Sequence, residues 1–254
     1  MKDGLTAIAR LRSQVEGEEF DYLALLRALE DYAYPRDKIT TMLRRGDIVR
    51  VKKGIYVFGR THARRPYSRE ILANMIHGPS YVSLDSALQY HGLIPEGVEA
   101  VTSMTVNRAR RFATPLGLFI YRPSTPAAYS LGVDLVDVAG GAFLLATPEK
   151  ALADRIREDR GSRLTTVAGM RDYLIGHLRV YPEGLGSLDA DRVDAIAAAY
   201  RSRKVRLLAA VVRSVQEGLG SRVHHYFVEA DAFDLDLPVR SAPRVVLDFS
   251  DRQE

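Results

Sequence analysis

The sequence predicts an α+β fold in which a small N-terminal domain of helices and one β-hairpin precedes a mixed α/β C-terminal domain with a helical C-terminal part. Three observations lead to this prediction. Apolar residues recur at helical spacing across the first 45 residues. Two short apolar runs then flank a turn-forming Lys-Lys-Gly sequence. Beyond residue 98, four apolar segments of strand length precede several helical segments.

The N-terminal helices follow from apolar spacing and from helix-end signals. Apolar stripes cover residues 5–15 and 20–29, and the polar residues between them predict a break in the chain. Pro35 suits the first turn of a third helix over residues 36–45, because its fixed φ is already helical. Gly46 is well suited to end that helix.

A β-hairpin follows the third helix. Residues 48–51 lead into a turn at residues 52–54, and residues 55–58 return as the second strand. Three helices followed by a hairpin are typical of a winged helix-turn-helix domain. We place this domain at residues 1–66, because the basic, proline-containing segment 60–68 has the composition of a connector.

The C-terminal domain is predicted to span residues 67–254. It should hold a mixed sheet and helices to about residue 160 and be mainly helical over 162–218, whereas the pattern of residues 220–254 predicts no particular element. Thr147 and Pro148 mark a clear helix start. Strands are expected at residues 98–106, 118–122, 133–138 and 142–146.

Composition is that of an ordinary globular protein. The 254 residues are 46% hydrophobic and 27% charged. The absence of cysteine excludes disulfides, thiolate metal sites and cysteine nucleophiles. The N-terminus lacks the apolar core of a signal peptide, and the longest apolar runs are too short to cross a bilayer. We therefore expect a cytoplasmic protein with no membrane partner.

Positive charge is concentrated in one segment. Residues 34–69 hold eleven Lys and Arg against two Asp, a net charge of +9, whereas the whole chain carries only +4. Everything outside this segment therefore sums to −5. Concentrated positive charge on a helix-turn-helix pattern predicts binding to double-stranded DNA.

Helical phase predicts which residues of the third helix face DNA. Ile39, Met42 and Leu43 share one face and should be buried, which leaves Asp37, Thr41 and Arg44 pointing most directly outward. Arginine can bind guanine edges, and threonine can bond to bases or phosphate. We predict DNA contacts at Arg36, Lys38, Thr40, Thr41, Arg44, Arg45, Arg50, Lys52, Lys53, Arg64 and Arg65. The alternative is an ordinary solvated helix face.

Two further basic clusters have two interpretations each. One comprises Asn107, Arg108, Arg110, Arg111 and Arg122, and it either extends the phosphate footprint or is a solvated loop. The other lies within residues 201–206, where two helices join, and it either meets nucleic acid or an acidic partner or is solvated.

The sequence holds no recognisable catalytic constellation. None of the six histidines has a partner at metal-ligand spacing. Asp234 and Asp236 form a D-x-D pair, but the upstream Gly161-Ser162 follows a predicted helix, whereas a nucleotidyltransferase site needs a Gly-Ser turn at a strand–helix junction. Glu149 is explained by a helix start, and Lys150 with Asp154 by an i,i+4 pair, the alternative being a partner-binding surface. We therefore expect no enzymatic activity, no cofactor and no bound metal.

Four phrases, in order, resemble a known family. They are "LRRGDIVRVKKGIYVF" (43–58), "YVSLDSALQYHGLIPE" (81–96), "VTSMTVNRARRF" (101–112) and "FLLATPEKALADRI" (143–156). Together they resemble the AbiEi antitoxins of type IV abortive-infection toxin–antitoxin systems, over about residues 21–158. The stretch after about residue 220 has no counterpart in that pattern.

The resemblance implies a protein with two functions. The winged helix would bind inverted repeats in its own promoter and repress the operon, and the C-terminal domain would counteract a nucleotidyltransferase-like toxin, without a stable complex being required. The alternative is a transcriptional regulator whose C-terminal domain binds a ligand or another protein, with no toxin partner. A nucleic-acid-processing enzyme is a third interpretation, against which the missing catalytic residues argue.

Overall fold

The computed structural model describes the backbone of residues 6–230 and the side chains of residues 6–218. Residues up to Gln216 belong to one compact unit, and a second unit begins at Glu217. Asp234 and Asp236 lie outside the described residues, as do the side chains of His224 and His225. No helix within residues 6–230 is long and apolar enough to cross a membrane.

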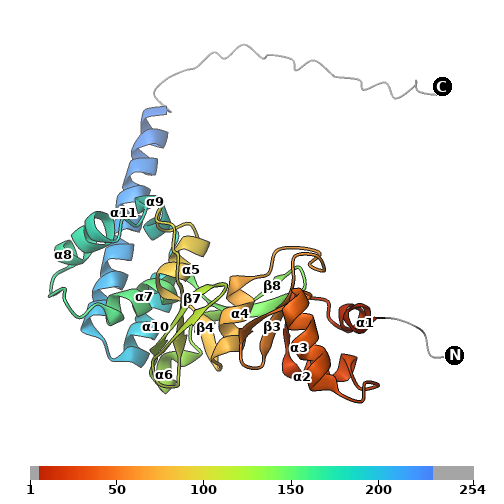
Figure 1. Ribbon diagram of the computed structural model, residues 1–254. Coiled ribbons are helices and arrows are strands. Elements are labelled where there is room, and N and C mark those ends of the chain that lie inside the picture. Colours follow the sequence, from red (N-terminus) through yellow and green to blue (C-terminus); the bar gives the residue numbers. More distant parts are fainter. Residues whose placement is uncertain (1–5, 231–254) are drawn as a thin grey trace, which may run out of the picture. The chain divides into compact units, whose positions relative to one another are not determined.

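The N-terminal part contains three helices and three strands (Figure 1). In chain order they are α1 (Ala7–Gln14), β1 (Glu19–Asp21), α2 (Tyr22–Ala28), α3 (Pro35–Arg45), β2 (Ile48–Lys52) and β3 (Ile55–Phe58). The strands form an antiparallel sheet in the order β1-β3-β2. Strand β1 corrects the sequence analysis, which predicted only the hairpin and a break at residues 16–19.

Local signals define α2 and α3 as expected. The Asp21 side chain caps α2 by accepting a hydrogen bond from Ala24 N at 2.9 Å. Pro35 occupies the first turn of α3, and Gly46 ends it with a φ of 72°. Gly59 packs so closely against this cap that an added Cβ would lie 1.8 Å from Gly46 O.

The hairpin separates two hydrophobic clusters. Tyr56 and Phe58 of β3 pack with Ile39 and Met42 of α3 in the N-terminal cluster. Three other hairpin residues belong to the larger cluster of the C-terminal part, namely Val51, Ile55 and Val57. Neither face of β3 is therefore exposed to solvent. The hairpin joins the parts on either side of residue 66, and the domain boundary there stays a prediction.

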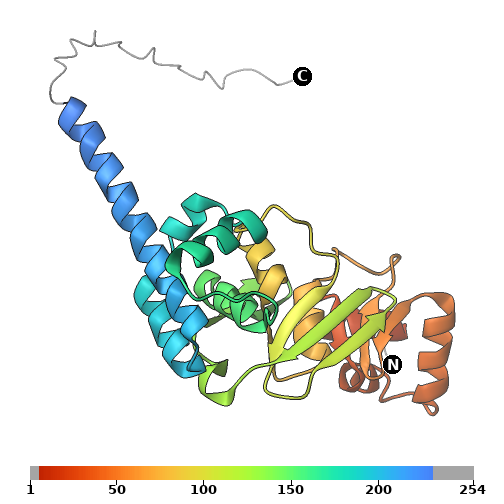
Figure 2. The ribbon, with the colours of Figure 1, turned by 90° about the vertical axis from the view of Figure 1, so that its left-hand side faces the viewer.

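The C-terminal part begins with a mixed sheet. Its strands are β4 (Ser80–Val82), β5 (Val101–Thr105), β6 (Arg110–Thr114), β7 (Gly117–Pro123), β8 (Val133–Val138) and β9 (Gly141–Ala146). The strand order is β6-β7-β5-β4-β9-β8, and the pairs β5–β7 and β4–β9 are parallel. Figure 2 shows the yellow to yellow-green strands β5, β6 and β7 side by side. All four predicted strands are present, whereas β4 and β6 were not predicted.

Helices cover both faces of this sheet. They are α4 (Arg69–Ile76), α5 (Leu84–Tyr90), the short α6 (Pro126–Tyr129) and α7 (Pro148–Glu158). The Tyr121 hydroxyl of β7 donates to Ala73 O of α4 at 2.7 Å, which places α4 on the Tyr121 face. Side chains alternate along a strand, so Ile120 and Arg122 face the opposite side, where α5 contacts both β5 and α7. Figure 1 shows the same division.

The remaining described residues are mainly helical, as predicted. They form α8 (Val167–Asp172), a π-helical segment (Tyr173–His177), α9 (Pro182–Gly186), α10 (Ala190–Tyr200) and α11 (Arg203–Ala230). Arg213 of α11 bonds to Asp191 and Asp194 of α10, at 3.0 and 2.6 Å. The chain is thus a mixed α+β protein, in agreement with the predicted fold class.

Candidate nucleic-acid interface

The exposed face of α3 carries much of the predicted DNA-binding set. Ile39 and Met42 are buried as predicted. The outward face is centred on Asp37, Thr40 and Arg44. Thr41 is half-buried instead, because the buried stripe extends around the helix towards it. The outward positions of Asp37 and Arg44 are therefore confirmed, whereas that of Thr41 is wrong.

Two cations of α3 point into solvent with most of their hydrogen-bonding capacity free. Arg44 has no partner among the described residues, and Arg45 makes only a 3.8 Å contact with Asp47 while 69% exposed. Lys38 is half-buried, with its Nζ 5.2 Å from the Tyr32 ring. The hydroxyls of Thr40 and Thr41 donate to carbonyls one turn back, which leaves their oxygens able to accept hydrogen bonds.

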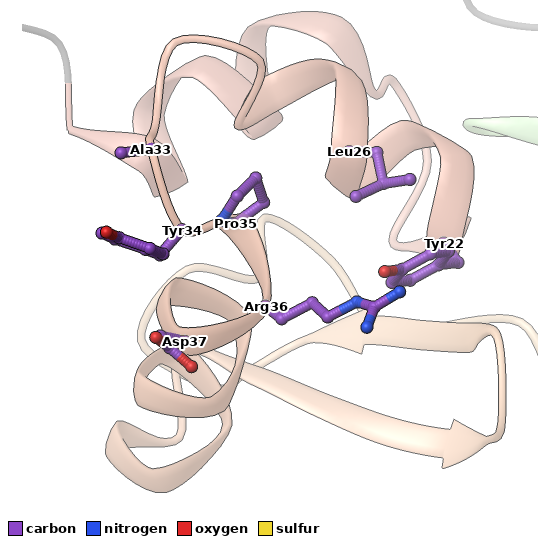
Figure 3. A pocket seen from close by; sticks show the side chains of 7 residues that line it. All are labelled: Tyr22, Leu26, Ala33, Tyr34, Pro35, Arg36 and Asp37. Carbon is purple, nitrogen blue, oxygen red and sulfur yellow. The ribbon is translucent and has the colours of Figure 1, made fainter.

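A shallow hollow lies beside the first turn of α3. Its volume is about 470 Å³, and Tyr22, Leu26, Tyr34 and Arg36 are among its lining residues. Figure 3 shows the Arg36 guanidinium directed towards Tyr22 at the start of α2. A guanidinium and a phenol hydroxyl on one rim are chemically suited to a phosphate oxygen.

The hairpin cations divide into free and engaged groups. Arg50 and Lys53 are exposed without partners among the described side chains. Lys52 is the last residue of β2 and donates from Nζ to Ile76 O of α4 at 2.7 Å. The same ammonium lies 4.5 Å from the ring of Phe112 on β6. Lys52 therefore connects the hairpin to the C-terminal part, and its predicted place at the turn is corrected.

The two predicted DNA-binding arginines of the connector also differ: one is exposed, and the other is bonded within the protein. Arg64 has an exposed side chain, and its backbone N donates to Glu18 Oε1 at 3.2 Å. Arg65 instead donates from Nη2 to Glu16 O at 2.7 Å. It also packs against the β8–β9 turn, where a Cβ on Gly140 would lie 1.8 Å from Arg65 Nη2. Arg65 thus has a structural partner that the sequence did not reveal.

The second predicted basic cluster is divided by the pleat of the sheet. Arg110 pairs with Tyr121 and Arg111 with Ile120, so the two arginines face opposite sides. Arg111 lies on the same face as Arg122. In the third cluster, Lys204 donates from Nζ to Asp159 O at 2.8 Å, so it supports a loop rather than remaining solvated.

Three charged residues of α7 are buried, namely Glu149, Lys150 and Asp154. Lys150 and Asp154 are 0% exposed and 3.6 Å apart, which confirms the i,i+4 pair. Asp154 also accepts hydrogen bonds from the hydroxyls of Tyr81 (3.0 Å), Ser83 (2.7 Å) and Tyr200. Burial lowers the pKa of Lys150 below its ordinary value.

Glu149 of α7 is also buried and has its own partners. It accepts hydrogen bonds from Asp189 N at 3.0 Å and from Arg192 Nη1 at 3.4 Å, and only 5% of its surface is exposed. The alternative of a partner-binding surface at Glu149, Lys150 and Asp154 is therefore wrong, because none of the three side chains is accessible. No group of three His, Asp or Glu within the described range has the arrangement of a metal site.

Comparisons with known proteins concern the fold alone. No protein-family model and no curated protein matches the chain. Among solved structures, the RV2827C protein from Mycobacterium tuberculosis is similar, at 17% identity and a TM-score of 0.51, over 81% of this chain and 76% of that one. JHP933 from Helicobacter pylori aligns at 13% identity and a TM-score of 0.30, over 64% of this chain and 94% of that one, which supports no conclusion.

Proposed function

We propose that the N-terminal part is a winged helix-turn-helix domain that binds double-stranded DNA through α3 and the β2–β3 hairpin. The element order α1-β1-α2-α3-β2-β3 and the sheet order β1-β3-β2 support this assignment. The observation that carries the proposal is the set of exposed cations without strong partners on α3 and the hairpin, namely Arg36, Arg44, Arg45, Arg50 and Lys53. Thr40 adds a base- or phosphate-bonding group to the same face.

The contact set is narrower than the one predicted from sequence. Lys52 and Arg65 are engaged within the protein, and we leave them out of the proposed DNA contacts. Arg64 remains a candidate phosphate contact, because its side chain is exposed. Phosphate contacts of this kind supply affinity, and they make binding strongly dependent on salt.

We further propose that the protein acts as an antitoxin and represses its own operon. This proposal rests on the resemblance of residues 21–158 to AbiEi antitoxins. The DNA target would be inverted repeats in the promoter of its own gene, and the counteracted toxin would be nucleotidyltransferase-like. The alternative remains a regulator with a ligand- or protein-binding C-terminal part and no toxin.

A binding assay tests the DNA proposal. The full chain is titrated into a labelled duplex covering the region upstream of its gene, at physiological salt, in a gel-shift assay. Arg44→Ala with Arg45→Ala should weaken binding by at least about tenfold, because each specific arginine contact typically contributes about 1–3 kcal/mol. Arg163→Ala with Arg171→Ala removes the same charge from exposed positions far along the chain and should have little effect. If the two double variants lose DNA binding equally, or if neither loses it, the assignment of the DNA-binding surface to the exposed face of α3 is refuted.

Co-expression tests the antitoxin proposal separately. The full chain and its Arg44→Ala, Arg45→Ala variant are each expressed with the proposed toxin, a nucleotidyltransferase-like protein that this proposal expects to be encoded beside the gene. Both should relieve its toxicity, whereas only the unaltered chain should repress a promoter reporter. If neither relieves toxicity while both remain folded, the antitoxin function is wrong and the regulator alternative stands.

A further inference from the structure

A polar cleft lies on the sheet face that α5 and α7 cover. Its volume is about 510 Å³, within the range usual for small-molecule sites. Five charged residues line it, and we call it the arginine cleft: Asp85 of α5, Arg122 of β7, Arg155 and Glu158 of α7, and Arg160 just beyond α7. None of these residues has a part in the proposed DNA interface.

Two of the three arginines carry uncompensated charge. Arg155 donates from Nε to Asp85 Oδ1 at 2.9 Å, and Glu158 lies 3.6 Å from Arg157 Nη1. Arg122 and Arg160 are exposed and have no side-chain partner among residues 6–218. The pairing of both carboxylates leaves these two guanidiniums available to an anion from outside the protein. Arg111 lies on the same sheet face and adds to the positive field there.

The loop that carries Arg160 is held in a fixed geometry. The carboxylate of Asp159 accepts hydrogen bonds from Gly161 N (2.9 Å), Ser162 N (3.0 Å) and the Tyr173 hydroxyl (2.6 Å). These bonds hold the pKa of Asp159 well below its usual range. Lys204 secures the same residue from α11 by donating to its carbonyl at 2.8 Å. A guanidinium on such a loop loses little loop entropy when it binds a ligand.

The floor of the cleft is also fixed. Thr102 of β5 donates from Oγ1 to Ser83 O at 2.8 Å and accepts from Ser86 N at 3.3 Å, which ties the start of α5 to the sheet. Leu84 lies between them with a φ of 57°, a conformation that is strained for leucine. Backbone strain of this kind occurs preferentially at functional sites. Leu84 and Ile120 supply the apolar surface of the cleft.

From these features we infer that the arginine cleft binds a phosphorylated small molecule, with its phosphate between Arg122 and Arg160. A guanidinium is planar and matches two phosphate oxygens at once, which favours phosphate over a spherical anion. Glu158 can accept hydrogen bonds from hydroxyl groups of the ligand, and the apolar floor suits a ring. A nucleotide or a sugar phosphate has this combination of groups.

Calorimetric titration of the full chain tests the inference. The probes are inorganic phosphate, ribose 5-phosphate and adenosine monophosphate, with ribose and adenosine as uncharged counterparts. At least one phosphorylated probe should bind saturably with a Kd below about 1 mM, and its counterpart should bind at least about tenfold more weakly. No saturation by any phosphorylated probe up to about 10 mM, or equal binding of the counterparts, would overturn the inference.

Substitutions then locate the site. Arg122→Gln with Arg160→Gln should weaken binding of the phosphorylated probe by at least about tenfold. Arg163→Gln removes an exposed charge three residues along the same loop and should leave binding unchanged. Arg122→Lys with Arg160→Lys retains charge without the planar fork and should give an intermediate loss. Unchanged binding by the Gln pair, with circular dichroism showing a folded protein, would place the phosphate elsewhere and overturn the inference.

A competition experiment distinguishes this site from the DNA interface. Duplex DNA from the upstream region should not displace the phosphorylated probe, because the proposed DNA contacts are on α3 and the hairpin. Displacement of the probe by DNA from the unaltered chain, together with weaker DNA binding by the Arg122→Gln, Arg160→Gln variant, would show that these arginines hold a DNA backbone instead. That outcome would overturn the small-molecule assignment and leave the proposed DNA-binding function intact.

Discussion

Removal of the Asp154 carboxylate should strongly destabilise the protein. Asp154 is fully buried on α7 and receives three hydroxyl hydrogen bonds as well as the Lys150 contact. In Asp154→Ala, the Lys150 ammonium would remain buried without a counter-ion, and its hydrogen-bond acceptors would be the Tyr200 hydroxyl (2.8 Å) and the Ala128 carbonyl. The donors Tyr81 and Ser83 would lose their acceptor at the same time.

The expected loss follows from the chemistry of buried ion pairs. Removing one partner of such a pair costs about 3–5 kcal/mol, because the other charge is left uncompensated. Typical domains are stable by about 5–15 kcal/mol, so Asp154→Ala would remove about a fifth or more of that. Lys150→Met should cost less, about 3 kcal/mol at the lower end of that range, because the Asp154 carboxylate loses its counter-ion but keeps its three hydroxyl donors.

Urea unfolding followed by far-UV circular dichroism measures both effects. The combination of Lys150→Met with Asp154→Ala should cost clearly less than the two single losses added together, because it removes both charges from the core. The m-value should stay constant across the series. If Asp154→Ala loses less than about 1 kcal/mol, or less than Lys150→Met, the buried pair does not organise this core as described.

Two further predictions concern burial and close packing. Burial raises the pKa of several tyrosines above the ordinary value of 10.0, among them Tyr81, Tyr121 and Tyr200. The folded state keeps protons that the unfolded state loses, so this stability is complete below pH 10.0 and falls as the pH rises above it. Tyrosinate absorbance should therefore contain a cooperative step that coincides with loss of circular dichroism, and a gradual titration of all tyrosines in a folded protein would contradict this. Separately, Gly59→Ala would place Cβ 1.8 Å from Gly46 O and should cost about 1–3 kcal/mol in thermal unfolding, whereas Gly97→Ala meets no atom within 4 Å and serves as the control. Equal midpoints for these two variants would show that the Gly46–Gly59 contact can relax.

Local signals in the sequence were sufficient to predict most elements. Pro35, Gly46 and the apolar spacing between them define α3 without help from the rest of the chain. Strand β1 was missed because it has three residues and begins in the acidic pair Glu18-Glu19, which suggests a solvated break. Both carboxylates have partners elsewhere in the chain: Glu18 pairs with Arg12 at 2.5 Å, and Glu19 accepts a hydrogen bond from Ser68 N.

In the candidate site, the sequence could predict exposure only for residues on a single helix, where helical periodicity separates the buried face from the exposed one. Helical periodicity identified the exposed arginines of α3, although it misplaced Thr41. It could not show that Lys52 and Arg65 are engaged, because their partners lie 24 and 49 residues away in the chain. The spacing of Lys150 and Asp154 predicted their pairing but not their burial, since charged side chains are rarely buried completely.

The arginine cleft could not be predicted from the sequence either, because its residues come from separate elements. Its arginines come from β7, from α7 and from the residue that follows Asp159, so no single sequence window contains them. Only the strand register brings Arg111 and Arg122 to one face and sends Arg110 to the other. What the sequence presents as one basic cluster is therefore two surfaces with different neighbours.

The hairpin determines how the two proposed functions can be separated. Val51, Ile55 and Val57 are buried against the C-terminal part, and burial of each such side chain stabilises a protein by about 1.5–3 kcal/mol. A fragment that ends at residue 66 would expose these side chains and lose the Lys52–Ile76 bond. The summed loss is comparable with the whole stability of a domain of that size. Point substitutions on the exposed face of α3 leave this core intact, so they separate DNA binding from the C-terminal function where truncation would disturb both.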